Sequence, residues 1–79
     1  MAQISLESCK RIEKRRNTVQ DKVHTTYTTF EIDGEKYVQL DTYGRIDRET
    51  PDKSSQTIQL DRETAEFLVQ LLKKEFDLS

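Results

Sequence analysis

The chain has 79 residues, of which 35% are charged and 33% are hydrophobic, and its formal net charge is −2. The near-neutral charge excludes a broad positive field for nucleic acid, the single cysteine excludes an internal disulfide, and no apolar run is long enough to span a membrane. We therefore expect one cytoplasmic domain over residues 1–79, without cofactor or metal, that gains buried surface by oligomerisation.

Charge is unevenly distributed along the chain. Residues 1–22 contain six Lys or Arg and three Asp or Glu, so this basic segment carries +3 while the whole chain carries −2. Such a segment is interpreted either as a solvated surface or as an arm that faces anions.

The basic segment also has a thin apolar pattern. Ser5 is a residue type that caps helices, and the apolar residues after it recur at roughly helical spacing. These are Leu6, Cys9 and Ile12. The pattern predicts a helix from Ser5 to Arg16, with a short strand near Ile4 as the alternative.

Two alternating segments around Asp33-Gly34 predict a β-hairpin. Residues 23–32 read VHTTYTTFEI and residues 36–43 read KYVQLDTY, and both are rich in threonine, aromatic and aliphatic β-branched residues. An Asp-Gly pair between two such runs is a strong hairpin signal. If these two residues form the loop, then Phe30 faces Tyr37, Tyr27 faces Leu40 and Glu31 faces Lys36.

Period-two alternation sorts this hairpin into two faces, although a one-residue bulge would exchange part of the sorting. The face expected to meet the core carries Val23, Thr25, Tyr27, Thr29, Val38, Leu40 and Thr42. The face expected to contact a ligand or partner carries His24, Thr26, Thr28, Phe30, Tyr37, Gln39, Asp41 and Tyr43.

Residues 54–60, SSQTIQL, predict a third strand, and Asp61 then caps a C-terminal helix that ends near Phe76. The fold class is therefore α+β, with a small antiparallel sheet of three or four strands over residues 23–60 and an amphipathic helix over residues 61–76 packed on one face. The predicted core consists of Leu40, Ile58, Leu60, Leu68 and Leu72.

The apolar sector of the C-terminal helix is wider than one small sheet needs. Phe67 and Leu71 extend it on one side. Deep coverage within one chain would account for this width. We instead predict a homodimer in which Phe67 and Leu71 pack on a second copy, because so short a chain has little else to cover them.

Residues 44–53 form a long polar connection between the second and third strands. Ten residues exceed the usual length of such loops, and long loops on a rigid sheet are often functional. Its basic residues are balanced by three acidic ones, so a plain solvated loop is the alternative to an anion-binding one. The basic residues are Arg45, Arg48 and Lys53.

No catalytic set is apparent in the sequence. His24 and Cys9 belong to different predicted elements, and no glycine-rich phosphate loop, nucleophile elbow or metal-ligand cluster occurs. We therefore expect a binding protein rather than an enzyme. Aromatic side chains on a sheet face are the kind of surface on which nucleic-acid bases stack. The candidate nucleic-acid-binding residues are Arg11, Arg15, Tyr37, Gln39, Tyr43, Arg45, Arg48 and Lys53.

The order of elements, with residues 53–76 reading KSSQTIQLDRETAEFLVQLLKKEF, resembles the single-stranded-DNA-binding transcriptional coactivators of the positive-cofactor-four and Whirly type. The resemblance covers about half the chain. The basic, glycine-rich stretch of that family is reduced here to DKSSQ, and its first strand would have to come from residues 4–16. The resemblance implies a dimer built on the C-terminal helices and a sheet that holds a nucleic-acid strand.

The function expected from the sequence is a non-enzymatic, nucleic-acid-associated module, such as a single-stranded-DNA-binding accessory protein of transcription or defence. The alternative is a protein-interaction or inhibitor module that binds a protein partner through the same aromatic face or a sheet edge.

Overall fold

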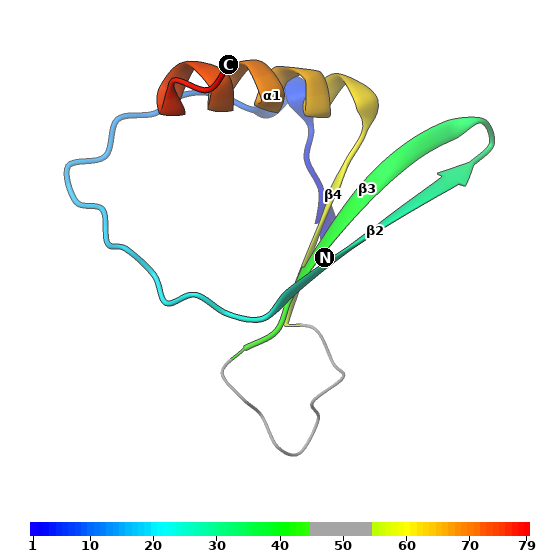
Figure 1. The fold of residues 1–79 in the computed structure, drawn as a ribbon, viewed down its shortest axis with the longest axis horizontal. Coiled ribbons are helices and arrows are strands. Elements are labelled where there is room, and N and C mark those ends of the chain that lie inside the picture. The colour runs from blue at the N-terminus through cyan, green and yellow to red at the C-terminus, as the bar shows by residue number, and fades with distance from the viewer. Residues whose placement is uncertain (45–54) are drawn as a thin grey trace.

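The computed structural model describes residues 1–44 and 55–79, which form a small α+β fold of one sheet and one long helix (Figure 1). The predicted fold class is confirmed. The elements, in chain order, are β1 (Ala2–Gln3), a 3-10 turn (Leu6–Ser8), β2 (Thr25–Ile32), β3 (Glu35–Thr42), β4 (Gln56–Leu60) and α1 (Arg62–Phe76).

The hairpin of β2 and β3 has the register expected from the sequence. Phe30 pairs with Tyr37, and Tyr27 pairs with Leu40. Asp33 and Gly34 form the loop and both have positive φ, at 52° and 80°. This conformation is that of the mirror-image turns that match the twist of a two-residue hairpin, and glycine adopts it without a steric penalty.

The four strands lie in the order β1-β4-β3-β2. β3 is antiparallel to both β2 and β4, whereas β1 runs parallel to β4, so the sheet is mixed. The parallel pair is short: Ala2 pairs with Ile58, Gln3 pairs with Gln59, and the Ile4 N–H donates to the Gln59 carbonyl at 3.0 Å.

The helix predicted from Ser5 to Arg16 is wrong. The structure has only the 3-10 turn at Leu6–Ser8, and residues 9–24 form neither helix nor strand. An apolar stripe of three residues gives too little buried surface to offset the unfavourable nucleation of a helix. The alternative of a short strand near Ile4 is closer to what is observed, since β1 ends at Gln3.

α1 begins and ends as its sequence indicates. The Asp61 carboxylate accepts a hydrogen bond from the Thr64 N–H at 2.9 Å, which satisfies one of the free donors of the first turn. The same bond is the main reason that the pKa of Asp61 lies below its usual value. At the other end Asp77 adopts the left-handed conformation, and its N–H donates to the Lys73 carbonyl.

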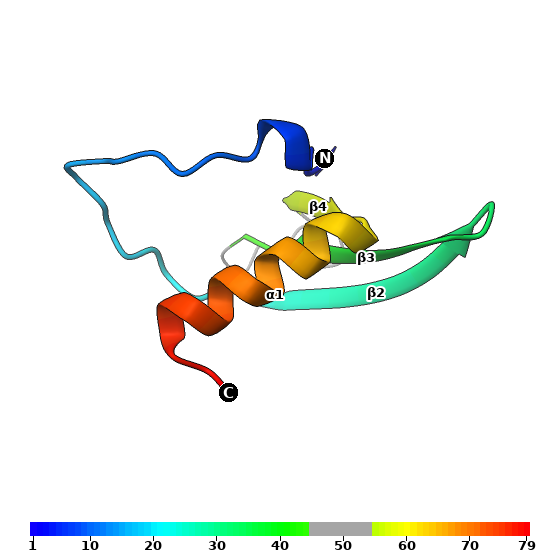
Figure 2. The ribbon, with the colours of Figure 1, turned by 90° about the horizontal axis from the view of Figure 1, so that it is seen from above.

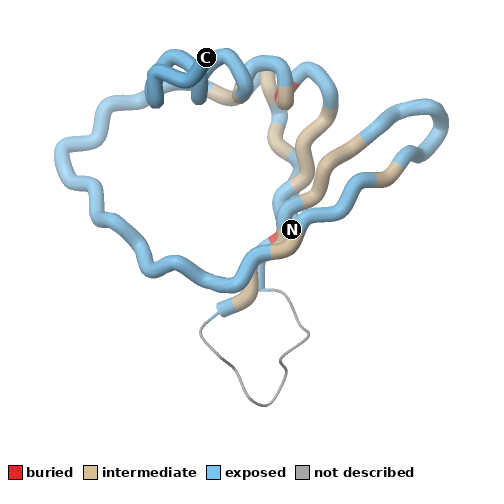
Figure 3. Tube along the Cα trace, in the orientation of Figure 1, coloured by how far each residue is buried: buried red, intermediate tan, exposed pale blue. Residues whose placement is uncertain are grey.

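The predicted apolar core is absent from a single chain. Among the described residues no hydrophobic side chain is buried; Leu40 is 37% exposed, Ile58 39% and Leu72 45%. Leu60 and Leu68 are half-buried. Figure 3 shows how few positions along the chain are buried. The reason is that α1 meets the sheet only at its first turns and then runs away from it, so most of each apolar surface lacks a partner (Figures 1 and 2).

The total accessible surface area of the chain is also large for its mass. The chain exposes 7812 Å², whereas a compact monomer of 9.3 kDa is expected to expose about 5,000 Å². The difference exceeds the roughly 800 Å² that each partner buries in a standard protein interface. A single copy of this chain therefore leaves much more surface in water than a stable domain of its size does.

Candidate functional site

The register of the strands divides the sheet into two unlike faces. The apolar face meets the start of α1, where Val38 and Leu60 line a pocket of about 170 Å³ together with Arg62 and Ala65. This apolar face carries Ala2, Tyr27, Val38, Leu40, Ile58 and Leu60. The opposite face, here called the polar face, carries Gln3, Thr26, Thr28, Phe30, Tyr37, Gln39, Asp41, Thr57 and Gln59, with His24 and Tyr43 just beyond the strand ends.

A row of glutamines crosses the polar face from β1 to β3. The Gln3 amide Nε2 donates to Gln59 Oε1 at 3.4 Å, and Gln59 Nε2 donates to Gln39 Oε1 at 2.8 Å. Gln39 Nε2 in turn donates to Asp41 Oδ2 at 3.0 Å. The amide dipoles are thus aligned across three strands and end on a carboxylate, an arrangement in which each bond polarises the next.

Asp41 is the charged centre of the polar face. It accepts from the Thr57 hydroxyl on β4 as well as from Gln39. The Thr57 bond and then the Gln39 bond hold the pKa of the Asp41 carboxyl below its usual value, because both donors favour the ionised form. Asp41 is therefore an oriented carboxylate at neutral pH.

Two aromatic pairs bracket these polar rows. Near the hairpin, Phe30 and Tyr37 stack with ring centroids 5.4 Å apart and an interplanar angle of 25°. At the other end, His24 and Tyr43 lie 5.0 Å apart at 39°, and the Tyr43 hydroxyl is 3.1 Å from the Thr26 hydroxyl. Tyr37 and Tyr43 are separated by six residues of extended chain, which corresponds to about 20 Å.

The two ends of the polar face differ in charge. At the hairpin end Glu35 continues the polar face and Asp33 lies in the turn, whereas Glu31 and Lys36 pair with each other on the apolar face. The other end continues directly into the basic segment, whose last cation is two residues before His24. A polyanion is therefore repelled at the Tyr37 end, whereas at the Tyr43 end the charge of Lys22 is balanced by the adjacent Asp21.

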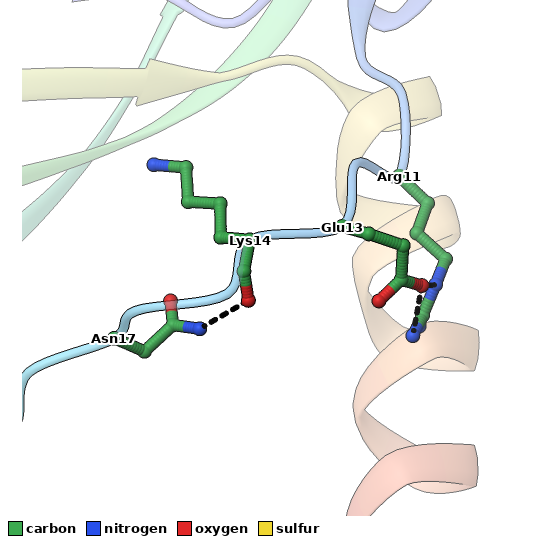
Figure 4. Close-up of polar contacts among 4 residues, drawn as sticks. All are labelled: Arg11, Glu13, Lys14 and Asn17. Carbon is green, nitrogen blue, oxygen red and sulfur yellow. Dashed lines mark hydrogen bonds and ion pairs between the residues drawn. The ribbon is translucent and has the colours of Figure 1, made fainter.

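The structure places the predicted cations of the basic segment away from the polar face. Residues 9–24 leave the neighbourhood of α1 and return to the start of β2 in a wide arc (Figure 1). Arg11 lies beside α1 and is 2.9 Å from Glu13, an exposed ion pair shown in Figure 4. Nearby, the Asn17 amide donates to the Lys14 carbonyl at 3.1 Å. Arg15 is exposed on the same arc.

The remaining predicted residues fall into three groups. Tyr37, Gln39 and Tyr43 do share the polar face. Phe67 and Leu71, at 39% and 38% exposed, line an open groove of about 420 Å³ between α1 and residues 9–12. The other candidates, Arg45, Arg48 and Lys53, lie outside the described residues.

Sequence reasoning missed three members of the polar network. Gln59 and Thr57 alternate with Ile58 and Leu60, so the alternation of the third strand already held the signal for them. Gln3 joins only through the two-residue parallel pairing of β1, for which the sequence has no local signal.

The described residues contain no candidate metal site. No group of three or more His, Cys, Asp or Glu side chains lies close enough together there to hold a metal ion. No helix in the described ranges has the length and apolarity needed to cross a bilayer. Comparison with known protein families, characterised proteins and solved structures finds no match for this chain.

Proposed function

We propose that the protein is a non-enzymatic, single-stranded-nucleic-acid-binding module that acts as a homodimer in the cytoplasm. The observation that carries this proposal is the polar face: a solvent-accessible strip of aromatic, amide and hydroxyl side chains on the side of the sheet opposite α1. Bases stack on aromatic side chains and bond to amides and hydroxyls, so this surface has the chemistry that unpaired bases require.

The position of α1 supports this choice of face. Had α1 covered Tyr37 and Tyr43, no such surface would exist. α1 instead meets Val38 and Leu60, which leaves both tyrosines on the far side. Phe30, Tyr37 and Tyr43 are half-buried, and His24, which is exposed, packs against Tyr43, so the rings are oriented before any ligand arrives.

The homodimer follows from the surfaces that remain. The open part of the apolar face and the groove beside Phe67 and Leu71 both lie on the α1 side of the sheet. A second copy can cover both without touching the polar face. A dimer also doubles the number of polar faces, which increases avidity for a strand long enough to reach both.

Phosphate attraction is expected at the Tyr43 end, where the basic segment joins β2. Arg11 and Arg15 would act from a distance, and Arg45, Arg48 and Lys53 follow Tyr43 in the chain. This arrangement is consistent with the resemblance to single-stranded-DNA-binding coactivators, which suggests an accessory role in transcription or defence.

The proposal is tested by titrating a labelled single-stranded oligonucleotide with the full chain at two salt concentrations. Tyr43→Ala should weaken binding by about 1–3 kcal/mol, the contribution of one aromatic platform. Tyr27→Ala is the matched control on the opposite face, because Tyr27 is 74% exposed and belongs to the apolar face. It should leave unchanged the affinity for a strand that spans only one polar face, because the loss of a dimer contact lowers avidity only for longer strands.

Two results would reject the proposal. One is the absence of binding by the wild type at low salt and micromolar protein. The other is an equal loss of affinity in Tyr43→Ala and Tyr27→Ala. The protein-interaction alternative would then be the better account, with the same polar face as its first contact surface.

A further inference from the structure

Asp41 is a feature of the polar face that general strand binding does not explain. A surface that only attracts a polyanion has no need of a carboxylate at its centre, since the negative charge repels phosphate. We propose that Asp41 recognises guanine in the bound strand, by accepting the two adjacent donors of the Watson–Crick edge of that base. This inference rests on the proposed function and specifies which base of the single strand the protein prefers.

The carboxylate is oriented and still has acceptor capacity. Oδ1 accepts from Thr57 and Oδ2 accepts from Gln39, so two strands fix its position. Each carboxylate oxygen has two lone-pair sites. Within the described part of the chain each oxygen receives one bond, which leaves one acceptor site on each for a ligand. Both acceptors belong to a half-buried side chain that solvent reaches.

Guanine is the base whose donors match such a pair of acceptors. Its N1–H and exocyclic N2–H₂ point the same way from adjacent positions, as do the paired N–H groups of arginine that carboxylates bind in fork geometry. Adenine and cytosine each place a ring-nitrogen acceptor beside their amino group, and thymine and uracil have one N–H between two carbonyls. A carboxylate therefore gains two bonds with guanine and repels an acceptor in the other bases.

The neighbours of Asp41 favour a base over an arginine side chain of a protein partner. Tyr43 lies two residues away on the same face, about 7 Å along the strand, and forms a ring pair with His24 on which a base can stack. The basic segment joins the sheet at this end, with Lys22 two residues before His24. The adjacent Asp21 offsets the charge of Lys22, so it is the aromatic platform rather than charge that favours a base here.

The sharpest test changes only the ligand. The full-length wild type is titrated with a short oligothymidine that carries a single central guanine, and with the same strand carrying inosine, adenine or cytosine instead. Inosine lacks the N2 amino group of guanine and keeps the N1–H. We expect guanine to bind more tightly than inosine, and a good two-bond contact to discriminate by about 5- to 150-fold against adenine and cytosine.

A variant then connects the preference to the residue. Asp41→Asn keeps the shape and one acceptor oxygen and replaces the other acceptor by a donor. It should lose the preference for guanine, measured as the ratio of the affinities for the guanine strand and for plain oligothymidine, while the loss of a negative charge strengthens the binding of both strands. If Asp41 serves only to hold Thr57 and Gln39, Asp41→Asn lowers the melting temperature but leaves the guanine preference intact, which would overturn the proposal.

The possible failures are distinguishable. Equal affinity of the wild type for the guanine and inosine strands rejects guanine recognition while single-strand binding stands. Binding of none of the strands rejects the proposed function as well. Tight binding of an arginine-bearing peptide, lost in Asp41→Asn, together with no binding of the strands would assign the carboxylate to a protein partner. Because the inosine comparison needs no variant, it decides the matter even if Asp41→Asn fails to fold.

Discussion

The two faces of the sheet differ in whether a single chain supplies the contacts that their side chains need. On the polar face, Gln3, Gln59, Gln39, Asp41 and Thr57 bond to one another across β1, β4 and β3. On the apolar face, Leu40 and Ile58 remain more than a third exposed, and α1 reaches only one end of it.

The difference shows which face satisfies its own side chains in water and which face leaves apolar side chains uncovered. Side chains that satisfy their own hydrogen bonds can face water without further structure. Covering the apolar surface of leucine or isoleucine with a partner would stabilise the protein by about 25 cal/mol for each Å² removed from water. The polar face is thus stable in water without a partner, whereas the apolar face would gain free energy from one, which is the basis for proposing a second copy there.

Introducing a glutamate on one face or the other should give the largest difference in stability between two variants. If a second copy covers the apolar face as proposed, Leu40→Glu should place an unpaired carboxylate in that interface and destabilise the protein by about 3–5 kcal/mol, enough to unfold a domain of this size. Thr28→Glu is the control: Thr28 is exposed, lies on the polar face of the neighbouring strand and pairs with Gln39.

Thermal melts and sedimentation measure both variants. We expect Leu40→Glu to lose the melting transition and the dimer, and Thr28→Glu to keep both while binding oligonucleotide less tightly. Equal stability of the two variants would show that the apolar face is not an interface.

Substitutions in the groove beside α1 should give the next largest effect, which is on self-association. Phe67→Glu combined with Leu71→Lys should weaken self-association by about 2–4 kcal/mol, as expected for two central interface residues, without changing the net charge. Sedimentation of the wild type at micromolar concentration should give twice 9.3 kDa. Gln70→Glu, at an exposed position of α1 that does not line this groove, should remain a dimer. A wild type that stays monomeric at high concentration would contradict this prediction.

Breaking the row of glutamines on the polar face should have the smallest effect on stability. Gln59→Ala removes the bonds to Gln3 and Gln39 but leaves their amides accessible to water, so the free energy of unfolding should fall by only about 1 kcal/mol. Denaturant melts measure this change. A loss of several kcal/mol would mean that the polar face contributes to the core stability of the protein, and the contrast between the faces would not hold.

Local signals made most of the fold predictable. The Asp33-Gly34 turn determined the register of the hairpin, and Asp61 determined the start of α1. The sequence did not predict β1 well, because its two residues are held by pairing with the edge of β4, more than fifty positions away in the chain. The core prediction was wrong because periodicity shows which side chains are apolar but not whether one chain can cover them.

The candidate site was predictable only where it follows alternation. Tyr37, Gln39 and Tyr43 were correctly placed on one face because they belong to a single alternating run. That Arg11 lies beside α1 depends on the path of residues 9–24, whose thin apolar pattern predicted a helix that does not form. The orientation of Asp41 depends on Thr57, a contact between strands that the sequence separates by a long connection.

The most direct test of the central claim, that the polar face binds nucleic acid and the apolar face does not, uses the side-chain amides of glutamine as reporters. Nuclear magnetic resonance spectra of ¹⁵N-labelled protein are recorded while a single-stranded oligonucleotide is added. The account predicts that the signals of Gln3, Gln39 and Gln59 shift, while Gln56, which pairs with Thr42 on the other face, and Gln70 on α1 stay in place. Shifts confined to Gln56 and Gln70, or no shift at all, would contradict it.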